Sequence, residues 1–368
     1  MSRNATTPPG AKAPASASLL ILAVILAVTA AACTPMPTPT PAPTAGQRAG
    51  TPGHVFIINL ENKGYDKIWD AGSAAPYLST TLRAQGVLLS QYYGIAHHSN
   101  PNYLAQISGQ GSNAMTRDDC PTYGPLTQTG EASPGQVKGT GCVYPASVPT
   151  VAGQLRSAGK SWKGYMEDMK TPCRHPELGA RDNDQKAKVG DQYATRHNPF
   201  VYFEEVTSSP DCRANVVDFS ELAADLRSVE TTPALSYITP NLCHDGHDNP
   251  CVDGSTGGLV SADAWLGEQI PRILESPAFK KDGMLVITFD EAEDSSGGPS
   301  GIPGGTAGGR VGALVLSPFI KGGTTSDRLY NHFSLQASVE DIFSLPRLGY
   351  AGAAGLNSFG NDVFNGRS

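Results

Sequence analysis

The chain has few charged residues and no basic stripe. Charged side chains make up 17% of its 368 residues, and the formal net charge is −7. Because nucleic-acid-binding surfaces are rich in Lys and Arg, this composition argues against a nucleic-acid partner. The 41 glycines and 29 prolines argue against a helical bundle or coiled coil. They favour a loop-rich globular protein.

Long hydrophobic runs are scarce. The N-terminal apolar stretch Leu19–Ala32 has 14 residues, whereas a helix needs about 20 to span a bilayer. With Arg3 and Lys12 before it, the stretch is typical of the core of a secretory signal. Small residues then precede Cys33 as in a bacterial lipobox, which favours lipidation of Cys33. Ordinary cleavage is the alternative, because Ala30 stands where Leu is more usual.

Three segments follow from these features. We expect residues 1–33 to be a signal peptide with a lipobox-like cysteine, residues 34–53 a disordered Pro/Thr-rich linker, and residues 54–368 a single catalytic domain. No internal repeat divides that domain. The protein would then be exported, either as a cell-surface lipoprotein or in secreted form. Its membrane contact would be only through the lipid anchor, and we expect a monomer.

The chain has no Cys-x-x-Cys pair, so its cysteines are poor candidates for a metal site. Six cysteines remain after Cys33, and an even number in an exported chain suggests disulfides. Six cysteines allow 15 pairings. One pair would close a short loop over the histidine cluster, and the other two pairs join cysteines that are neighbours in the sequence. The favoured pairs are Cys243–Cys251, Cys120–Cys142 and Cys173–Cys212.

Two apolar runs stop abruptly at acidic residues. The run 54–60 is followed by the pair Glu61–Asn62, and the run 283–289 by the pair Asp290–Glu291. Continuous apolar runs are typical of parallel strands that are buried on both faces, and ligands bind at the carboxyl ends of such strands. We therefore expect both pairs to line one site for a hard cation.

Strand and helix patterns alternate along the chain. Residues 110–145, rich in Gly, Pro, Thr and Ser, are expected to form a disulfide-pinned surface insertion. Alternation of this kind predicts a three-layer α/β/α sandwich around a mostly parallel sheet. The expected strands are 54–60, 87–93, 161–166, 233–238, 283–289 and 310–316, and the expected helices are 75–85, 101–108, 150–158, 218–227, 259–274 and 332–343.

A serine lies where a predicted strand ends and a helix begins. Ser99 precedes Pro101, a residue type that suits the first helical turn. A hydroxyl there is close to free N–H groups and the positive end of the helix dipole, which would stabilise both an alkoxide and a phosphate. Ser99 could be only a helix cap, but His97, His98 and Asn102 beside it favour a nucleophile.

A second polar group follows the strand 233–238. Two histidines and two aspartates occur within five residues, among them His244, Asp245 and His247. Imidazole and carboxylate together suit Zn²⁺, Mn²⁺ or Fe better than Ca²⁺, although a solvated polar loop is the alternative. His332, at the start of a predicted helix, is a further candidate for a ligand, a phosphate contact or a neighbour of the helix cap.

Together these motifs resemble the bacterial acid phosphatase/phospholipase C phosphoesterase family of the alkaline phosphatase superfamily. The likeness extends from about residue 53 to residue 347 and implies an alkaline phosphatase-like fold. Five ordered motifs carry it: Glu61-Asn62, His97-x-Ser99-x-Pro101-Asn102-Tyr103, Pro240-Asn241 with His244-Asp245-x-His247, Thr288-Phe289-Asp290-Glu291, and Asn331-His332.

The resemblance implies a metal site and a nucleophile. Ser99 would attack phosphorus, and a divalent metal ion (Zn, Ca, Mn or Mg, not distinguished by the sequence) would be bound by Glu61, Asn62, Asp290 and Glu291 together with the Ser99 hydroxyl.

The same resemblance implies roles in substrate binding and proton transfer. Asn102 would help to bind the phosphoryl oxygens, with His97 and His247 as further substrate contacts. A histidine, either His244 or His332, would protonate the leaving alcohol, since imidazole titrates near neutral pH.

Two positions depart from the patterns of relatives. Asn241 stands where two-zinc relatives have Asp, and a neutral amide is a poorer ligand for a dication. Tyr103 stands where sulfatases need Arg, so sulfatase activity is not expected. The residues left either to complete a second metal site or to contact phosphate are His244, Asp245, His247 and His332.

We therefore expect an exported, metal-dependent phosphoric ester hydrolase that acts through a serine nucleophile on a phosphate ester substrate. An acid phosphatase acting on monoesters is the first expectation, and a phospholipase C-type phosphodiesterase is the alternative. A non-catalytic surface lipoprotein that binds ligands is the remoter alternative.

Overall fold

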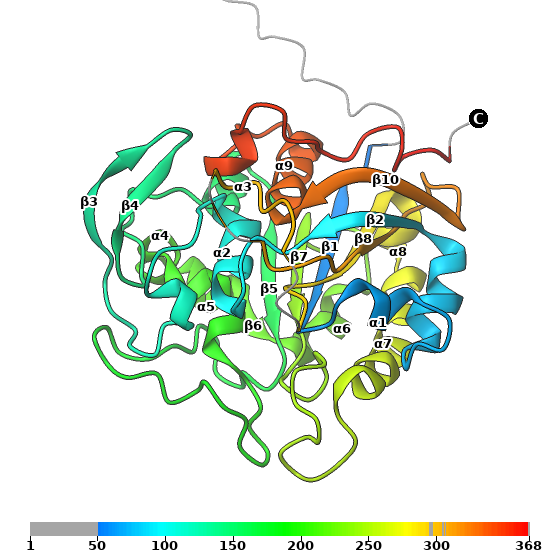
Figure 1. Ribbon diagram of the computed structural model, residues 1–368, viewed down its shortest axis with the longest axis horizontal. Coiled ribbons are helices and arrows are strands. Elements are labelled where there is room, and N and C mark those ends of the chain that lie inside the picture. The colour runs from blue at the N-terminus through cyan, green and yellow to red at the C-terminus, as the bar shows by residue number, and fades with distance from the viewer. Residues whose placement is uncertain (1–50, 294–296, 304, 306, 367–368) are drawn as a thin grey trace, which may run out of the picture. The chain divides into compact units, whose positions relative to one another are not determined.

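In the computed structural model, the described residues are 51–293, 297–303, 305 and 307–366. They contain an eight-stranded sheet with the strand order β10-β2-β9-β8-β1-β7-β5-β6 (Figure 1). Neighbouring strands are parallel except that β9 runs antiparallel to both β2 and β8. The strands of this sheet are β1 His54–Leu60, β2 Val87–Tyr93, β5 Trp162–Met166, β6 Val216–Asp218, β7 Leu235–Thr239, β8 Gly283–Phe289, β9 Ala313–Leu316 and β10 Thr324–Asn331.

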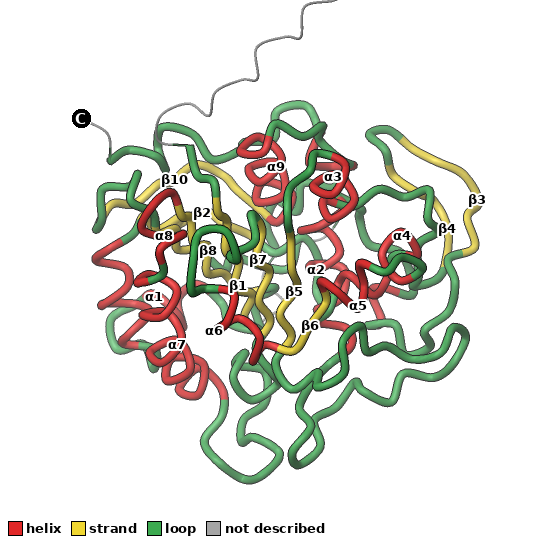
Figure 2. Tube along the Cα trace, turned by 180° about the vertical axis from the view of Figure 1, so that it is seen from behind, coloured by secondary structure: helices red, strands yellow, loops and turns green. Residues whose placement is uncertain are grey.

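Helices cover both faces of the sheet, as Figure 2 shows from behind. On one face α2 (Ser99–Ser108), α3 (Val151–Ser157) and α9 (His332–Phe343) pack against one another, and on the other α7 (Gly258–Glu275) packs beside α8 (Pro277–Asp282). The predicted α/β fold around a mostly parallel sheet is confirmed. The remaining helices are α1 Tyr65–Trp69, α4 Glu204–Thr207, α5 Asp211–Asn215 and α6 Leu222–Asp225, with a π-helical turn at Tyr77–Leu82 and 3₁₀ turns at Arg83–Gln85, Thr116–Asp118, Thr195–His197, Pro199–Tyr202, Phe219–Glu221 and Gly349–Gly352.

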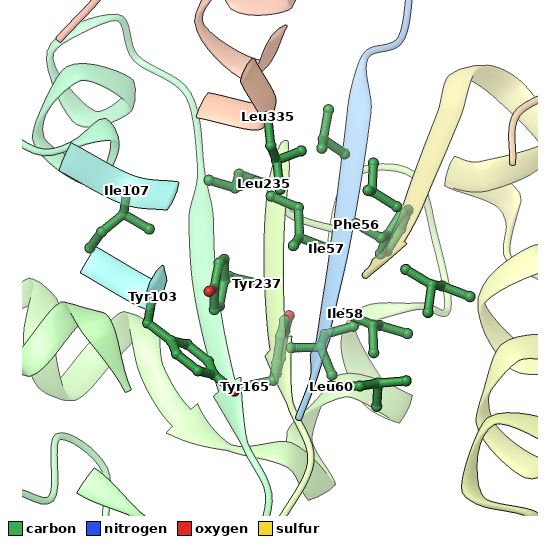
Figure 3. Packing of buried hydrophobic residues seen from close by; sticks show 14 of the residues in the cluster. Phe56, Ile57, Ile58, Leu60, Tyr103, Ile107, Tyr165, Leu235, Tyr237 and Leu335 are labelled. Atoms are coloured by element: carbon green, nitrogen blue, oxygen red, sulfur yellow. The ribbon is translucent and has the colours of Figure 1, made fainter. Parts of the chain in front are cut away.

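Strand β1 lies in the middle of the core. Its side chains alternate, so that Phe56 points toward the α8 side of the sheet and Ile57 toward the opposite side (Figure 3). The ring of Phe56 lies 6.4 Å from that of Phe279 in α8. On the other face, Asn59 accepts a hydrogen bond of 3.1 Å from Gln106 of α2. Burial on both faces explains why this strand is an uninterrupted apolar run.

Most expected elements are present, and β1, β2, β8 and α9 begin and end where the sequence predicts. The expected helix 75–85 is instead a π-helical turn followed by a 3₁₀ turn. Strand β10 was not predicted, because its sequence, TTSDRLYN, is polar and half of its positions are exposed. The surface insertion contains the hairpin β3 (Thr127–Ala132) and β4 (Gln136–Thr140), which was also not predicted.

The described residues contain three disulfides, which join the pairs that the sequence favours: Cys120–Cys142, Cys173–Cys212 and Cys243–Cys251. The expected signal peptide, the lipidation site Cys33 and the linker up to residue 50 lie outside the described residues. Within the described part of the chain, no helix combines the length and apolar character that a membrane span requires.

Candidate active site

Three neighbouring strands bring three acids together at their carboxyl ends. Strand β1 pairs with β8 on one side and with β7 on the other. Leu60 is in register with Phe289, so the residues that follow, Glu61 and Asp290, leave the sheet side by side. The backbone N–H of Glu61 donates to the carbonyl oxygen of Asp245, which follows β7, at 2.8 Å.

These carboxyl groups are buried and close to one another. Glu61, Asp245 and Asp290 are each 0% exposed. Burial and then repulsion from Asp290 and Asp245 raise the pKa of Glu61 well above its ordinary value. Burial raises the pKa of Asp290 to about 7, and hydrogen bonds from the backbone N–H groups of Asn62 and Glu291 oppose that rise. Like charges that share a buried site need a counter-ion, so the cluster is suited to a cation.

Glu291 extends the cluster on the β8 side. Its Oε2 lies 2.7 Å from Nδ1 of His97. Burial, followed by the charges of Asp290 and Asp119, raises the pKa of Glu291 to about 9. His97 therefore contacts a carboxyl group of the cluster.

Ser99 is the first residue of α2 and is 3% exposed. Its hydroxyl donates a hydrogen bond of 2.8 Å to Oε2 of Glu61. The residue before it, His98, has a φ of 76°, a left-handed backbone conformation that side chains other than Gly adopt at a cost and that often occurs at functional sites. The turn thus directs the Ser99 hydroxyl toward the carboxyl cluster.

Asn102 stabilises this turn. Its Oδ1 accepts from the backbone N–H of Ile95 at 2.8 Å and of Ala96 at 3.2 Å. Its Nδ2 donates to the carbonyl oxygens of Ala96 at 2.9 Å and His98 at 2.8 Å. Both ends of the amide are therefore engaged by the chain itself, in a position that holds the turn before Ser99.

Two further residues hold Glu61. The hydroxyl of Tyr103 donates to Oε1 of Glu61 at 2.6 Å. Asn62 donates from Nδ2 to Oε2 of Glu61 at 3.0 Å, and its backbone N–H donates to Oδ1 of Asp290 at 3.0 Å. Asn62 thus connects the two carboxyl groups that the sequence assigns to the metal.

His197 lies in the site, although no sequence motif predicts it. It belongs to the 3₁₀ turn Thr195–His197, and in the sequence no strand ends just before this turn. Its Nε2 is 3.4 Å from Oε1 of Glu61, and its Nδ1 is 3.2 Å from Oδ2 of Asp245. Burial lowers the pKa of His197 well below its ordinary value, so the ring is neutral and can act as a metal ligand.

His332 supports the site from behind. Its Nε2 donates to the backbone oxygen of Asp290 at 2.6 Å. Its Nδ1 lies 3.0 Å from the Tyr92 hydroxyl and 3.1 Å from Nε2 of Gln106, which assigns Nδ1 as the acceptor. Burial lowers the pKa of His332 to about 4. Both ring nitrogens are therefore occupied, and the ring is neutral.

The histidine-rich loop does not gather its side chains around one point. His244 Nδ1 lies 2.9 Å from Glu167, which raises the pKa of His244 although burial opposes the rise. Nδ2 of Asn241 donates to Asp168 at 3.1 Å. His247 contacts Arg196 through Nε2 at 3.1 Å. Of the residues that the sequence offers for a second metal site, the structure brings Asp245 into the carboxyl cluster.

Residues 69–346 match the Phosphoesterase family, and the chain belongs to that family. An acid phosphatase of Aspergillus fumigatus is 29% identical over 294 residues, which cover 80% of this chain and 55% of that protein. A phosphatidylinositol-3-phosphatase of Mycobacterium tuberculosis is 25% identical over 298 residues, which cover 81% and 79% of the two chains. The chain spans a little over half the length of the fungal acid phosphatases that it matches, between 54% and 59%.

A similar fold occurs among solved structures. A candidate sulfatase from Bacteroides thetaiotaomicron superposes with a TM-score of 0.51 at 11% sequence identity, covering 86% of this chain and 75% of that chain. At that identity the likeness concerns the fold alone. It agrees with the α/β fold around a mostly parallel sheet.

Proposed function

We propose that this protein is a metal-dependent phosphoric ester hydrolase with Ser99 as its nucleophile. One observation carries the proposal: the Ser99 hydroxyl, at the N-terminus of α2, donates at 2.8 Å to a buried carboxylate, Glu61. A carboxylate acceptor orients the hydroxyl and can take its proton. The helix N-terminus favours an incoming phosphate. Membership of the phosphoesterase family supports the same chemistry.

The carboxyl cluster fits a divalent metal ion. Oδ2 of Asp245, Oδ2 of Asp290 and both ring nitrogens of His197 are buried without a hydrogen-bond partner. Glu61, His197 and Asp245 offer ligand atoms that lie within 4.8 Å of one another. We propose that Glu61 and Asp290 bind the ion together with His197 and Asp245. Asn62, Glu291 and the Ser99 hydroxyl would complete the site.

A bound dication would polarise a phosphoryl oxygen and lower the pKa of the serine hydroxyl. Imidazole and carboxylate together favour Zn²⁺ or Mn²⁺. The chain's own groups perform the transfer. Oγ of Ser99 attacks phosphorus as its proton passes to Glu61, the bond to the leaving oxygen breaks, and phosphoserine forms. Water then attacks phosphorus, the bond between phosphorus and Oγ breaks, and Glu61 returns its proton to Oγ, which releases phosphate and restores the Ser99 hydroxyl.

The leaving alcohol needs a proton. Between the two histidines expected for this step, His332 has both ring nitrogens engaged. His244 contacts Glu167 through Nδ1, which leaves Nε2 to act, and we propose His244 for the role. His332 instead positions Asp290 through the backbone oxygen of that residue.

The proposed substrates are phosphomonoesters. Three fungal relatives are named acid phosphatases, and the mycobacterial relative is named for a phosphatidylinositol phosphate. A phospholipase C-type diesterase is the alternative. Turnover of p-nitrophenyl phosphate against bis-p-nitrophenyl phosphate and phosphatidylcholine separates them.

Ser99→Ala tests the nucleophile. We expect kcat to fall by about three orders of magnitude or more, while the circular dichroism spectrum is unchanged. Mass spectrometry of acid-quenched wild type should find phosphate on Ser99. Ser108→Ala, at the other end of α2, is the matched control and should keep its activity. Near-full activity of Ser99→Ala would leave Ser99 as a helix cap and remove the proposed mechanism.

We also propose that the protein is exported and anchored through Cys33. The disulfides are consistent with an oxidising compartment. Cys33→Ser should release the protein from the membrane fraction or block its processing. If the wild-type protein is already free of the membrane and begins beyond residue 33, the lipid anchor is wrong and the protein is secreted in the ordinary way.

A further inference from the structure

A buried guanidinium lies beside the carboxyl cluster. Arg196 directly precedes His197 and is 5% exposed. The ring of His197 lies 3.4 Å from Oε1 of Glu61 and 3.2 Å from Oδ2 of Asp245. Arg196 therefore lies beside two of the acids that would surround the proposed metal ion.

The guanidinium is held by neutral groups. Nη1 donates to the backbone oxygen of Gln185 and, at 3.4 Å, to its side-chain Oε1. Nη2 donates to Nε2 of His247 at 3.1 Å. The nearest carboxylate oxygen with which it forms an ion pair, in Asp119, is 4.0 Å from Nε, too far for a hydrogen bond. Arginine has five N–H donors, so two are left for a ligand.

Arg196 also occupies the lone pair of His247. Because Nη2 of Arg196 donates, Nε2 of His247 is the acceptor, and Nδ1 of His247 lies 2.7 Å from Asp248. A metal ion would need the same Nε2 lone pair. Asn241, which stands where two-zinc relatives have Asp, uses Oδ1 for the backbone N–H groups of Cys243 and His244. Nε2 of His247 and Oδ1 of Asn241 are thus already engaged by the protein itself.

We propose that Arg196 supplies the second positive charge of the phosphoryl site in place of a second metal ion, and that its free N–H groups bind a phosphoryl oxygen. The inference rests on the proposed function. A guanidinium stays charged throughout the physiological range, and its planar fork matches two oxygens of a phosphoryl group. The site would then work with one metal ion per chain.

The metal content of the wild-type protein tests the first half. Purified protein is dialysed against excess Zn²⁺ and, separately, Mn²⁺, then against metal-free buffer, and the bound ion is counted by mass spectrometry. One equivalent per chain is expected, and Glu61→Gln should lose it. Two equivalents in the wild type, or none, would overturn the proposal. This measurement does not depend on turnover or on the folding of an Arg196 variant.

The second half is tested with inorganic phosphate as the probe. Arg196→Gln should weaken phosphate binding, measured by calorimetry, by about 10- to 100-fold, the loss of a charge-assisted hydrogen bond. Arg196→Lys, which keeps the charge without the fork, should lie between Arg196→Gln and the wild type. Both should still bind one metal equivalent. Arg181→Gln, an exposed arginine on the loop that carries Gln185, is the control and should bind phosphate as the wild type does.

Wild-type affinity in Arg196→Gln would overturn the assignment. If that variant does not fold, Arg196→Lys and the metal content of the wild type decide instead. Wild-type phosphate affinity in the lysine variant would show that the guanidinium fork is not needed. Two metal equivalents in the wild type would show that the charge of Arg196 does not replace a second ion. An active Ser99→Ala protein would refute the proposed nucleophile, and the phosphate affinities would still report on Arg196. The two failures can therefore be told apart.

Discussion

The hydroxyl of Ser99 and the carboxylate of Glu61 form a hydrogen bond of 2.8 Å although 38 residues separate them in sequence. Ser99 begins α2, and Glu61 follows β1. Strand β2 precedes α2, and β1 precedes Glu61. Both strands end at the same edge of the sheet, so the sheet brings Ser99 and Glu61 into contact. Any change at Glu61 should therefore affect the metal ion and the nucleophile together.

Glu61→Gln keeps the size of the side chain and removes its negative charge. We expect loss of the bound metal ion and a fall in turnover by about two orders of magnitude or more, because a metal ion contributes several kcal/mol to the transition state. Metal analysis and kcat measure the two effects. Glu293→Gln changes a side chain that is 43% exposed near the same edge, and should leave both unchanged. Full metal occupancy in Glu61→Gln would exclude Glu61 as a ligand.

Removing the metal should destabilise the fold. Glu61, Asp245 and Asp290 are buried together, and without a cation their mutual repulsion is relieved only by protonation. A chelator should lower the unfolding temperature of the wild type by several degrees, and added metal should restore it. Thermal unfolding in both conditions measures this. In Glu61→Gln the chelator should have little effect, and an equal effect in both proteins would place the stabilising ion elsewhere.

The sequence predicts the acidic half of the site because the signal there is local. Strands β1 and β8 are continuous apolar runs, and each is followed at once by an acid. Parallel strands carry such residues to one edge. Strand β10 escapes the same reasoning: it is an edge strand with a polar sequence, and its pairing with β2 supplies the hydrogen bonds that define it.

The histidines could not be placed from sequence because their partners are distant. His244 contacts Glu167, 77 residues away, and His332 contacts Asp290, 42 residues away. A cluster of histidines indicates a polar loop near a strand end, but it does not say which carboxylate each ring will meet. In the sequence, His197 has no acidic or histidine residue beside it, and no strand ends just before it. Its position next to Glu61 therefore appears only in the folded chain.

The disulfide Cys243–Cys251 closes a short loop with a sequence separation of 8. The loop carries Asp245 and His247. Replacing both cysteines by Ser should lower the free energy of unfolding by about 2 to 3 kcal/mol, because the unfolded chain regains the entropy that the closed loop removes. Denaturant unfolding measures the change, and turnover should fall as Asp245 loses its support. Val252→Ser, in the same loop and exposed, is the control; a similar loss there would assign the effect to loop packing.

Glu340 is a buried acid outside the carboxyl cluster. It lies in α9 and is 0% exposed. Oε1 accepts from Nε2 of Gln336 at 2.8 Å and from the backbone N–H of Leu348 at 2.9 Å, while Oε2 is buried without a partner. Burial raises the pKa of Glu340 from 4.5 to about 8. The fold therefore favours the protonated form of this side chain.

The sign of the pH dependence follows from that shift. The folded state binds the Glu340 proton more tightly than the unfolded state does, so the resulting stability is fully present below about pH 4.5 and is lost as the pH rises toward about 8. The loss is on the order of several kcal/mol. Glu340→Gln has no proton to lose. Its unfolding temperature should be close to that of the wild type at pH 5 and increasingly higher from pH 6 to pH 9. Glu275→Gln, an exposed acid at the end of α7, should differ from the wild type equally at every pH. A constant difference for Glu340→Gln as well would mean that Glu340 is already ionised in the folded protein at pH 5.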